Sequence, residues 1–187
     1  MAQWANTTIY NMDAIQGSHI DPLDEVPTRG VYAVCGPPTD REIYGDVVNH
    51  WRIFFVLDGN RSISLDMVKE SATNTGGTLG VVGRNYSLTD HRVIFAGFST
   101  NGITVRTVLD FLEEHGYLRY RYAANGEGCR FWVKTVINAL RQSGRLTELV
   151  SPNVMLFNVA VEKLWTVSGP NRTVQWAPKA MQAGSFY

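Results

Sequence analysis

The chain has 187 residues, a length typical of one domain with its own core. Its 17 Lys and Arg residues balance 17 Asp and Glu residues, which argues against the basic surface that nucleic acids or anionic membranes require. No window reaches the roughly 18 apolar residues of a membrane span, and residues 1–17 lack the pattern of a secretory signal. We therefore expect one cytoplasmic domain over 1–187, with no nucleic-acid partner and no membrane span.

The two cysteines, Cys35 and Cys129, do not make a disulfide framework or a paired metal site. We interpret both as free thiols, and Cys35, which lies in an apolar run, as a core residue. No cluster of His, Cys and carboxylate residues predicts a metal, and the glycines of 76–83 lack the spacing of a nucleotide-binding loop. The sequence therefore predicts neither a metal nor a cofactor.

The first half of the chain is predicted to form strands. Apolar runs that end near turn residues, or that follow a glycine-rich turn, are found at 31–35, 49–57, 73–83 and 92–97. The run at 49–57 is rich in β-branched and aromatic residues and is followed by Asp-Gly-Asn at 58–60. This pattern predicts a central strand that continues into a hairpin.

The strand after this hairpin alternates polar and apolar residues. Its two faces carry Ile63, Leu65 and Met67 on one side and Ser62, Ser64 and Asp66 on the other. Strict alternation is typical of a strand with one buried and one solvated face. We therefore expect residues 62–67 to be half buried.

The second half is predicted to form helices. Apolar spacing and a following Gly116 predict a helix over 104–115, and Ser151-Pro152 predicts the start of another that runs toward Trp165. The strongest amphipathic pattern lies between them. It begins near Gly128 and puts one set of residues on the buried face, Cys129, Trp132, Val133, Val136, Ile137 and Leu140, with Arg130, Lys134 and Arg141 opposite.

This order of elements predicts an α+β fold in which an antiparallel sheet packs against helices. Residues 1–28 and 169–187 are predicted to be irregular segments at the two ends of the domain.

Cys129 is the candidate nucleophile, because it lies in the first turn of its predicted helix. Unpaired backbone N–H groups and the positive end of the helix dipole stabilise a thiolate there, and the same N–H groups can bind the oxyanion that forms when a thiolate attacks a carbonyl. We expect the substrate to bind beside the thiol, where Gly128 permits close approach to the backbone. The other expected substrate-binding residues are Trp51, Trp132 and Asn125.

A nucleophilic cysteine needs a base, and the chain has four histidines: His19, His50, His91 and His115. His115 lies at a helix end, where a cation complements the dipole, and His19 and His91 lie in predicted loops or strand edges. His50 begins the most apolar strand, where a polar ring requires a reason. We therefore predict His50 as the general base.

A third polar residue often orients the histidine of such a pair, and Asp66 on the neighbouring strand is the candidate. A three-residue turn at 58–60 would place residue 52 opposite residue 66, and Asp66 on the side of His50; a two-residue turn would reverse this. Ser64 has the same parity as Asp66 and is the alternative.

The order of these residues resembles the permuted papain-like folds, which include the NlpC/P60-like hydrolases, the lecithin:retinol acyltransferase-like proteins and the PPPDE peptidases. In these folds a histidine begins a strand, a polar residue follows on the next strand, and the cysteine comes later at a helix start. The corresponding residues here are His50 in His-Trp-Arg-Ile-Phe, Asp66 or Ser64, and Cys129 in Gly-Cys-Arg-Phe-Trp-Val. The likeness covers about 25 residues in two patches. Those families often carry Asn and His where this chain has Gly128 and Phe131.

The resemblance implies a cysteine-dependent hydrolase or acyltransferase that acts on an amide, ester or thioester of a small metabolite or peptide. The Gly-Cys-Arg-Phe-Trp core also resembles an uncharacterised family of fungal proteins, which implies a place in specialised metabolism. Two alternatives stay open: an isomerase or cyclase on the same fold, and a non-catalytic binding module in which Cys129 only packs. The expected partner is a small-molecule substrate, and a homodimer is left open.

Overall fold

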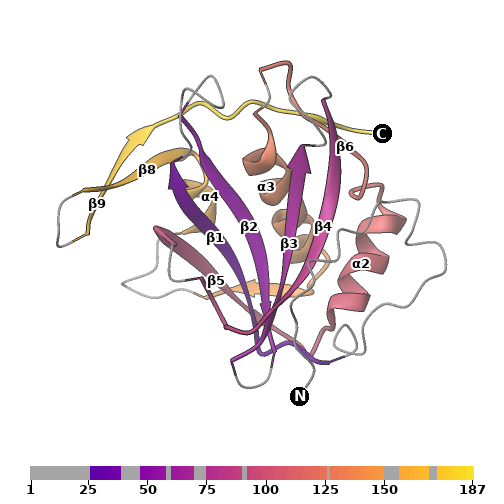
Figure 1. Cartoon of the computed structure of the whole chain (residues 1–187). Helices are drawn as coiled ribbons and strands as arrows, with labels where there is room; N and C mark the ends of the chain where they lie inside the picture. The colour runs from indigo at the N-terminus through magenta and orange to yellow at the C-terminus, as the bar shows by residue number, and fades with distance from the viewer. Residues whose placement is uncertain are drawn as a thin grey trace.

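An antiparallel sheet of eight strands forms the centre of the structure, a computed structural model (Figure 1). The described residues are 26–38, 47–57, 60–69, 75–89, 92–125, 127–149, 156–168 and 172–187. Within them the strand order is β10-β6-β4-β3-β2-β1-β5-β7, and a separate two-stranded sheet consists of β8 and β9. The predicted α+β class with an antiparallel sheet is confirmed.

Strands fill the first half of the described chain, as predicted, and shorter strands follow among the helices. Their bounds are β1 Gly30–Pro38, β2 Asn49–Val56, β3 Ser62–Lys69, β4 Gly76–Arg84, β5 Ile94–Thr100, β6 Tyr120–Arg121, β7 Leu146–Glu148, β8 Lys163–Ser168, β9 Thr173–Pro178 and β10 Ser185–Phe186.

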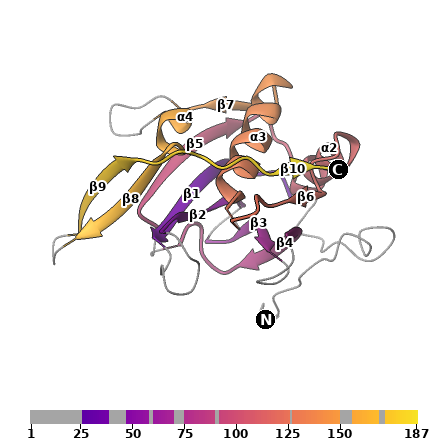
Figure 2. The same cartoon turned by 90° about the horizontal axis from the view of Figure 1, so that it is seen from above.

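Among the described residues, three helices lie on one face of the sheet (Figure 2): α2 Val105–Glu114, α3 Cys129–Gln142 and α4 Phe157–Ala160. Helix α2 begins after Thr104, whose hydroxyl accepts a hydrogen bond from the Thr107 N–H, and it ends before Gly116, which has a φ of 70°. These are the bounds that the sequence predicts. None of the helices in the described ranges has the length and apolarity needed to cross a membrane.

The main core lies between the helices and the sheet. One cluster of buried side chains joins β1, β2 and β3 to α2, α3 and α4, and its largest fully buried members include Trp51, Trp132 and Phe157. Helix α3 contributes the apolar face that the sequence predicts, since Trp132, Val133 and Leu140 are fully buried. The core therefore holds α3 against the central strands.

Strand β3 is buried on both faces, so the predicted half-buried strand is wrong. Ser62 donates a hydrogen bond to the Tyr86 carbonyl at 2.7 Å, and Ser64 lies 3.5 Å from the Val82 carbonyl. Buried polar groups are tolerated where they find partners, and the alternation in the sequence cannot show that these hydroxyls have them. The polar face of β3 is therefore enclosed rather than solvated.

The helix predicted from Ser151-Pro152 to Trp165 is also wrong. Residues 150–155 lie outside the described part, α4 spans only Phe157–Ala160, and Trp165 belongs to strand β8. Trp165 pairs with Trp176 across the β8–β9 hairpin, which projects from the body in Figure 1. This cross-strand pairing overrides the local helix signal.

The C-terminal segment is not the irregular tail that the sequence predicts, because it contains β9 and β10. Strand β10 pairs with β6 and places Phe186 against Tyr120 and Phe131. Of the predicted irregular segment at 1–28, residues 1–25 lie outside the described part. Pro27 forms an isolated bridge with Thr104.

Candidate active site

The start of helix α3 is shaped by a glycine. Gly128 has a φ of 155°, and a Cβ atom there would lie 2.6 Å from the hydroxyl of Tyr120. Only glycine fits this conformation and this approach. No side chain caps the helix, and its first turn carries no acidic residue. The positive end of the α3 dipole therefore lies at Cys129 without a side-chain cap from the described residues.

Strand β1 has a bulge opposite His50 of β2. Strand β1 pairs Cys35 with Trp51 and Pro38 with Asn49, so His50 faces two residues of β1. A bulge bends and twists its strand, and bulges often re-aim side chains beside active sites.

Strand β3 diverges from β2 next to this bulge. Their pairing runs from Val56↔Ser62 to Ile53↔Leu65 and ends there. Extending this register by one pair sets residue 52 opposite residue 66, which is the parity predicted for a three-residue turn. The Leu57 N–H donates a hydrogen bond to the Arg61 carbonyl across that turn. Asp66 therefore lies on the side of His50, although residues 58–59 themselves are outside the described part.

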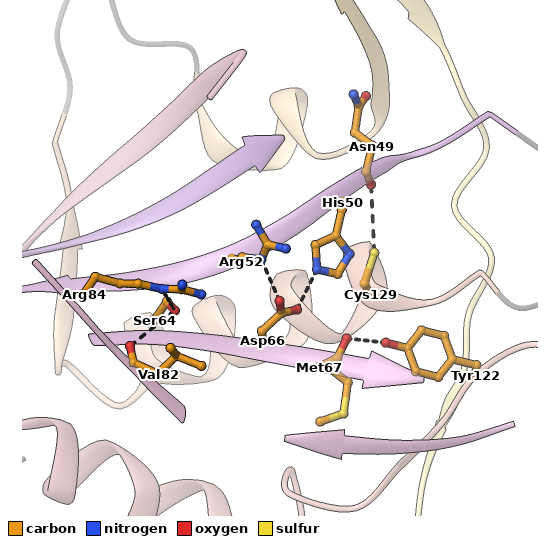
Figure 3. A network of polar contacts seen from close by, with 10 residues as sticks. All are labelled: Asn49, His50, Arg52, Ser64, Asp66, Met67, Val82, Arg84, Tyr122 and Cys129. Carbon is orange, nitrogen blue, oxygen red and sulfur yellow. Dashed lines mark hydrogen bonds and ion pairs between the residues drawn. The ribbon is translucent and has the colours of Figure 1, made fainter. Parts of the chain in front are cut away.

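The imidazole of His50 lies beside the carboxylate of Asp66 (Figure 3). Its Nε2 is 2.6 Å from Asp66 Oδ1, and Arg52 Nε donates to Asp66 Oδ2 at the same distance. Asp66 is buried, whereas 29% of the His50 side chain is exposed. Asp66 is thus held from two sides, and it does not lie on a solvated strand face as the alternation of residues 62–67 predicts.

The thiol of Cys129 lies where the backbone of a neighbouring strand would otherwise pair with β2. Its Sγ is 3.9 Å from the carbonyl oxygen of Asn49, and the N–H of Trp51 donates a hydrogen bond to the sulfur. The carbonyl of residue i and the N–H of residue i+2 point to the same side of a strand. Because β3 has diverged here, this side of β2 receives the sulfur instead.

His50 also hydrogen-bonds the Cys129 thiol, and this contact sets the charge of both groups. Burial alone would raise the pKa of Cys129, but the hydrogen bond and the charge of His50 outweigh it and lower that pKa. Burial alone would lower the pKa of His50, but its hydrogen bonds to Asp66 and Cys129 raise that pKa to about 10. The opposite shifts favour a thiolate–imidazolium pair near neutral pH.

Asp66 stays ionised beside this pair. Burial alone would raise the pKa of its carboxyl group, but the hydrogen bond and charge of His50, with those of Arg52, lower it. Arg52 was not among the residues singled out in the sequence. Arg52 can be assigned to Asp66 only from the register of β2 and β3, and that register depends on the length of the turn between them.

Arg130 anchors the C-terminal segment beside the same helix turn. It is buried, and its guanidinium donates to the carbonyls of Lys179 and Ala180 and lies 3.6 Å from Glu127. Its predicted place on the solvent face of α3 is wrong. A buried arginine requires such partners, and they lie in a segment far away in the sequence.

The residues predicted to bind substrate are only partly at the site. Trp51 and Trp132 are fully buried, and the Trp132 indole N–H donates to the Tyr117 carbonyl, so these rings belong to the core. Asn125 is exposed and accepts a hydrogen bond from the Glu127 N–H, which shapes the loop before α3. Gly128 lies at the thiol. Residue type and nearness in sequence indicate Trp51 and Trp132, but neither property shows whether a ring faces the core or the site.

The remaining candidates lie away from the thiol or outside the described part. His19 and His91 are not described, and His115 caps the end of α2, where its Nδ1 lies 2.9 Å from the Phe111 carbonyl. Ser64 is placed beside the Val82 carbonyl and Arg84 rather than at His50. No group of three metal-ligating side chains occurs among the described residues.

A groove of about 500 Å³ lies between the solvent face of α3 and residues 178–183. Phe131, Lys134 and Met181 contribute to its lining, whereas His50, Asp66 and Cys129 do not. This groove is separate from the thiol.

The family described as "Domain of unknown function (DUF7770)" matches residues 31–187. The chain belongs to this family. The DUF7770 range contains His50, Asp66 and Cys129 and all strands and helices described above, apart from Gly30 at the start of β1. No curated protein and no solved structure matches the chain.

Proposed function

We propose that this DUF7770 protein is a cysteine-dependent hydrolase or acyltransferase with Cys129 as nucleophile, His50 as general base and Asp66 as the residue that orients His50. The observation that carries the proposal is the position of the His50 imidazole, which contacts the Asp66 carboxylate at 2.6 Å and the thiol at the start of α3. A nucleophile, a base and an orienting carboxylate in this order are the parts that such chemistry needs.

The reaction follows from these positions. The Cys129 thiolate attacks the carbonyl carbon of an amide, ester or thioester, and the uncapped N–H groups of α3 stabilise the oxyanion. Protonated His50 gives its proton to the leaving group as the carbon–heteroatom bond breaks, which leaves an acyl thioester on Cys129. His50 then takes a proton from water or from an acceptor, and that nucleophile releases the acyl group.

The permuted papain-like arrangement is part of this proposal. Its support is the order of parts: histidine on β2, aspartate on β3, and cysteine at the start of a helix that packs on the central strands. We also infer a cytoplasmic location, because a catalytic thiol must stay reduced. The substrate would be a small metabolite or peptide, handled without metal or cofactor.

The test is to trap the acyl-enzyme. The protein is mixed at pH 7 with p-nitrophenyl esters and acyl thioesters of increasing chain length, quenched in acid, and analysed by intact-mass and peptide mass spectrometry. We expect an acyl group on Cys129 that disappears in Cys129→Ala and persists in the matched control Cys35→Ala. Turnover that survives in Cys129→Ala would contradict the proposal.

A non-catalytic binding module is the second candidate, because only 9% of the Cys129 residue surface is exposed. An isomerase or cyclase that uses His50 for acid–base catalysis is the third, and it would act without an acyl-enzyme. Absence of any acyl adduct across the panel, together with an unreactive thiol, would favour the binding module.

A further inference from the structure

The face of the sheet that carries His50 and Asp66 also carries two arginines, Arg52 and Arg84. Arg52 contacts Asp66 through Nε, and 38% of its side chain is exposed. Arg84 contacts the Ser64 hydroxyl through Nε at 3.3 Å and is partly exposed. Neither guanidinium has a further partner in the described ranges. Within the described part of the chain, the Nη groups of both arginines are therefore available to a ligand.

The register places these two guanidinium groups close to each other. Arg84 pairs with Ser62 across β3–β4 and reaches along the strand to Ser64, while Arg52 reaches Asp66. Ser64 and Asp66 lie about 7 Å apart along the strand, since residues i and i+2 share a face. Figure 3 shows both arginine side chains on the side of β3 where His50 and Asp66 meet.

Among the described residues of strands β1 to β5, this face carries more positive than negative charge. Asp66 is the one acidic residue in strands β1 to β5, and its carboxylate already accepts from His50 and Arg52. Arg84 has no carboxylate partner among the described residues. A planar guanidinium with free Nη groups matches a carboxylate, which it can bind through two parallel hydrogen bonds.

We propose that Arg52 and Arg84 form a subsite for a carboxylate group, so that the substrate of Cys129 carries a carboxylate in addition to its reacting carbonyl. This inference rests on the proposed nucleophile and adds the substrate class. Arg52 would have two roles, because its Nε orients Asp66 while its Nη groups face the ligand. Arg84 has no contact with the proposed catalytic residues, which makes it the cleaner probe.

The experiment compares two reagents that differ in one charge. N-iodoacetyl-β-alanine and its primary amide both alkylate a thiolate, forming a sulfur–carbon bond as iodide leaves, but only the acid carries a carboxylate, several bonds beyond the attacked carbon. The rate constants for Cys129 are measured at pH 7 and fixed ionic strength by peptide mass spectrometry. Each rate with the acid is divided by the rate with the amide for the same variant, which removes differences in thiolate content.

We expect this ratio to be about tenfold higher for Cys129 than for free cysteine, because a charge-assisted hydrogen bond contributes on that order. Arg84→Gln should lower the ratio about fivefold, and Arg84→Lys, which keeps the charge but loses the planar donors, should lower it less. The Arg52→Gln ratio should also fall. Thermal melts of each variant check that it folds.

The matched control is Arg145→Gln, which removes the same charge beyond the far end of α3, about 20 Å along the helix from Cys129. Its ratio should equal that of the wild type. Equal ratios in the wild type and in both Arg84 variants would overturn the subsite while leaving the nucleophile intact. A thiol that reacts slowly with both reagents would instead contradict the proposed function.

Discussion

The two cysteines are both buried, but the pKa values of their thiols are shifted in opposite directions. Cys35 on β1 is fully buried, its thiol lies 3.4 Å from the Gly36 carbonyl, and burial raises its pKa. Cys129 is also buried, yet its pKa is lowered because His50 and the Trp51 N–H outweigh burial. Burial makes a thiol inert unless charged and hydrogen-bonding partners compensate for the lost water.

Removing His50 should erase most of the difference between the two thiols. In His50→Ala the pKa of Cys129 should return to at least about 8.5, so that only about 1% of the thiol is ionised at pH 6.5. We expect the alkylation rate of Cys129 at that pH to fall about 100-fold, measured with iodoacetamide and peptide mass spectrometry. His115→Ala, at the end of α2, is the matched control and should leave the rate unchanged. A fall of less than threefold would contradict the role of His50.

Neutralising Asp66 should reduce the difference in reactivity between Cys129 and Cys35 less than removing His50 does. Asp66→Asn keeps the shape but removes the charge that holds His50 protonated, so the pKa of His50 should fall and that of Cys129 should rise by about one unit. We expect the pH midpoint of Cys129 alkylation to move up by about the same one unit, measured with iodoacetamide across the acid side of the pH profile. Asp110→Asn on the exposed face of α2 is the control. Unchanged alkylation in Asp66→Asn would show that Asp66 only supports the fold.

The ion pair should also appear in the pH dependence of stability. The pKa of His50 is raised, so its contribution is complete below about pH 6.5 and is lost as the pH rises through about 10. The pKa of Cys129 is lowered, so its contribution is complete above about pH 8.5 and is lost as the pH falls. Between about pH 6.5 and 8.5, the stability lost from His50 as the pH rises is offset by the stability gained from Cys129.

Wild type and His50→Gln should therefore differ most in melting temperature between about pH 6.5 and 8.5, by about 3 °C, and converge near pH 10. Differential scanning calorimetry at intervals of one pH unit measures the difference. A gap that widens steadily toward pH 10 would contradict the ion pair.

Ser64 should have the smallest effect, although its parity in the sequence equals that of Asp66. Its hydroxyl lies beside the Val82 carbonyl and Arg84 instead of His50. Ser64→Ala should lower stability by about 1 kcal/mol through the lost buried hydrogen bond and should keep the alkylation rate of Cys129 within about twofold. Urea unfolding and the iodoacetamide assay measure the two effects. A tenfold slower alkylation would mean that Ser64 orients His50.

The predictable parts of the structure are those with local signals. Thr104 and Gly116 mark the ends of α2, and Gly128 marks the start of α3. The parity that brings Asp66 to His50 stays open in the sequence, because it depends on the length of the turn after β2. The candidate nucleophile and base could be chosen because a polar residue at a helix start or in an apolar strand is unusual.

The parts that local signals miss depend on residues far apart in the sequence. Arg130 is buried because the carbonyls of Lys179 and Ala180 reach it, and Trp165 lies in a strand because Trp176 pairs with it. The role of Arg52 depends on the register of two strands. None of these contacts leaves a pattern within one segment, so the fold has to be known first.

The most direct test of the account is the pH dependence of alkylation of both cysteines in one wild-type sample. Iodoacetamide is added from pH 5.5 to 9.5, and labelling of Cys129 and Cys35 is followed separately by peptide mass spectrometry. The account predicts that Cys129 reacts at pH 6 at close to its pH 8 rate, while Cys35 stays unlabelled in the folded protein. Labelling of Cys129 only above about pH 8, or at the rate of Cys35, would contradict a thiolate paired with His50.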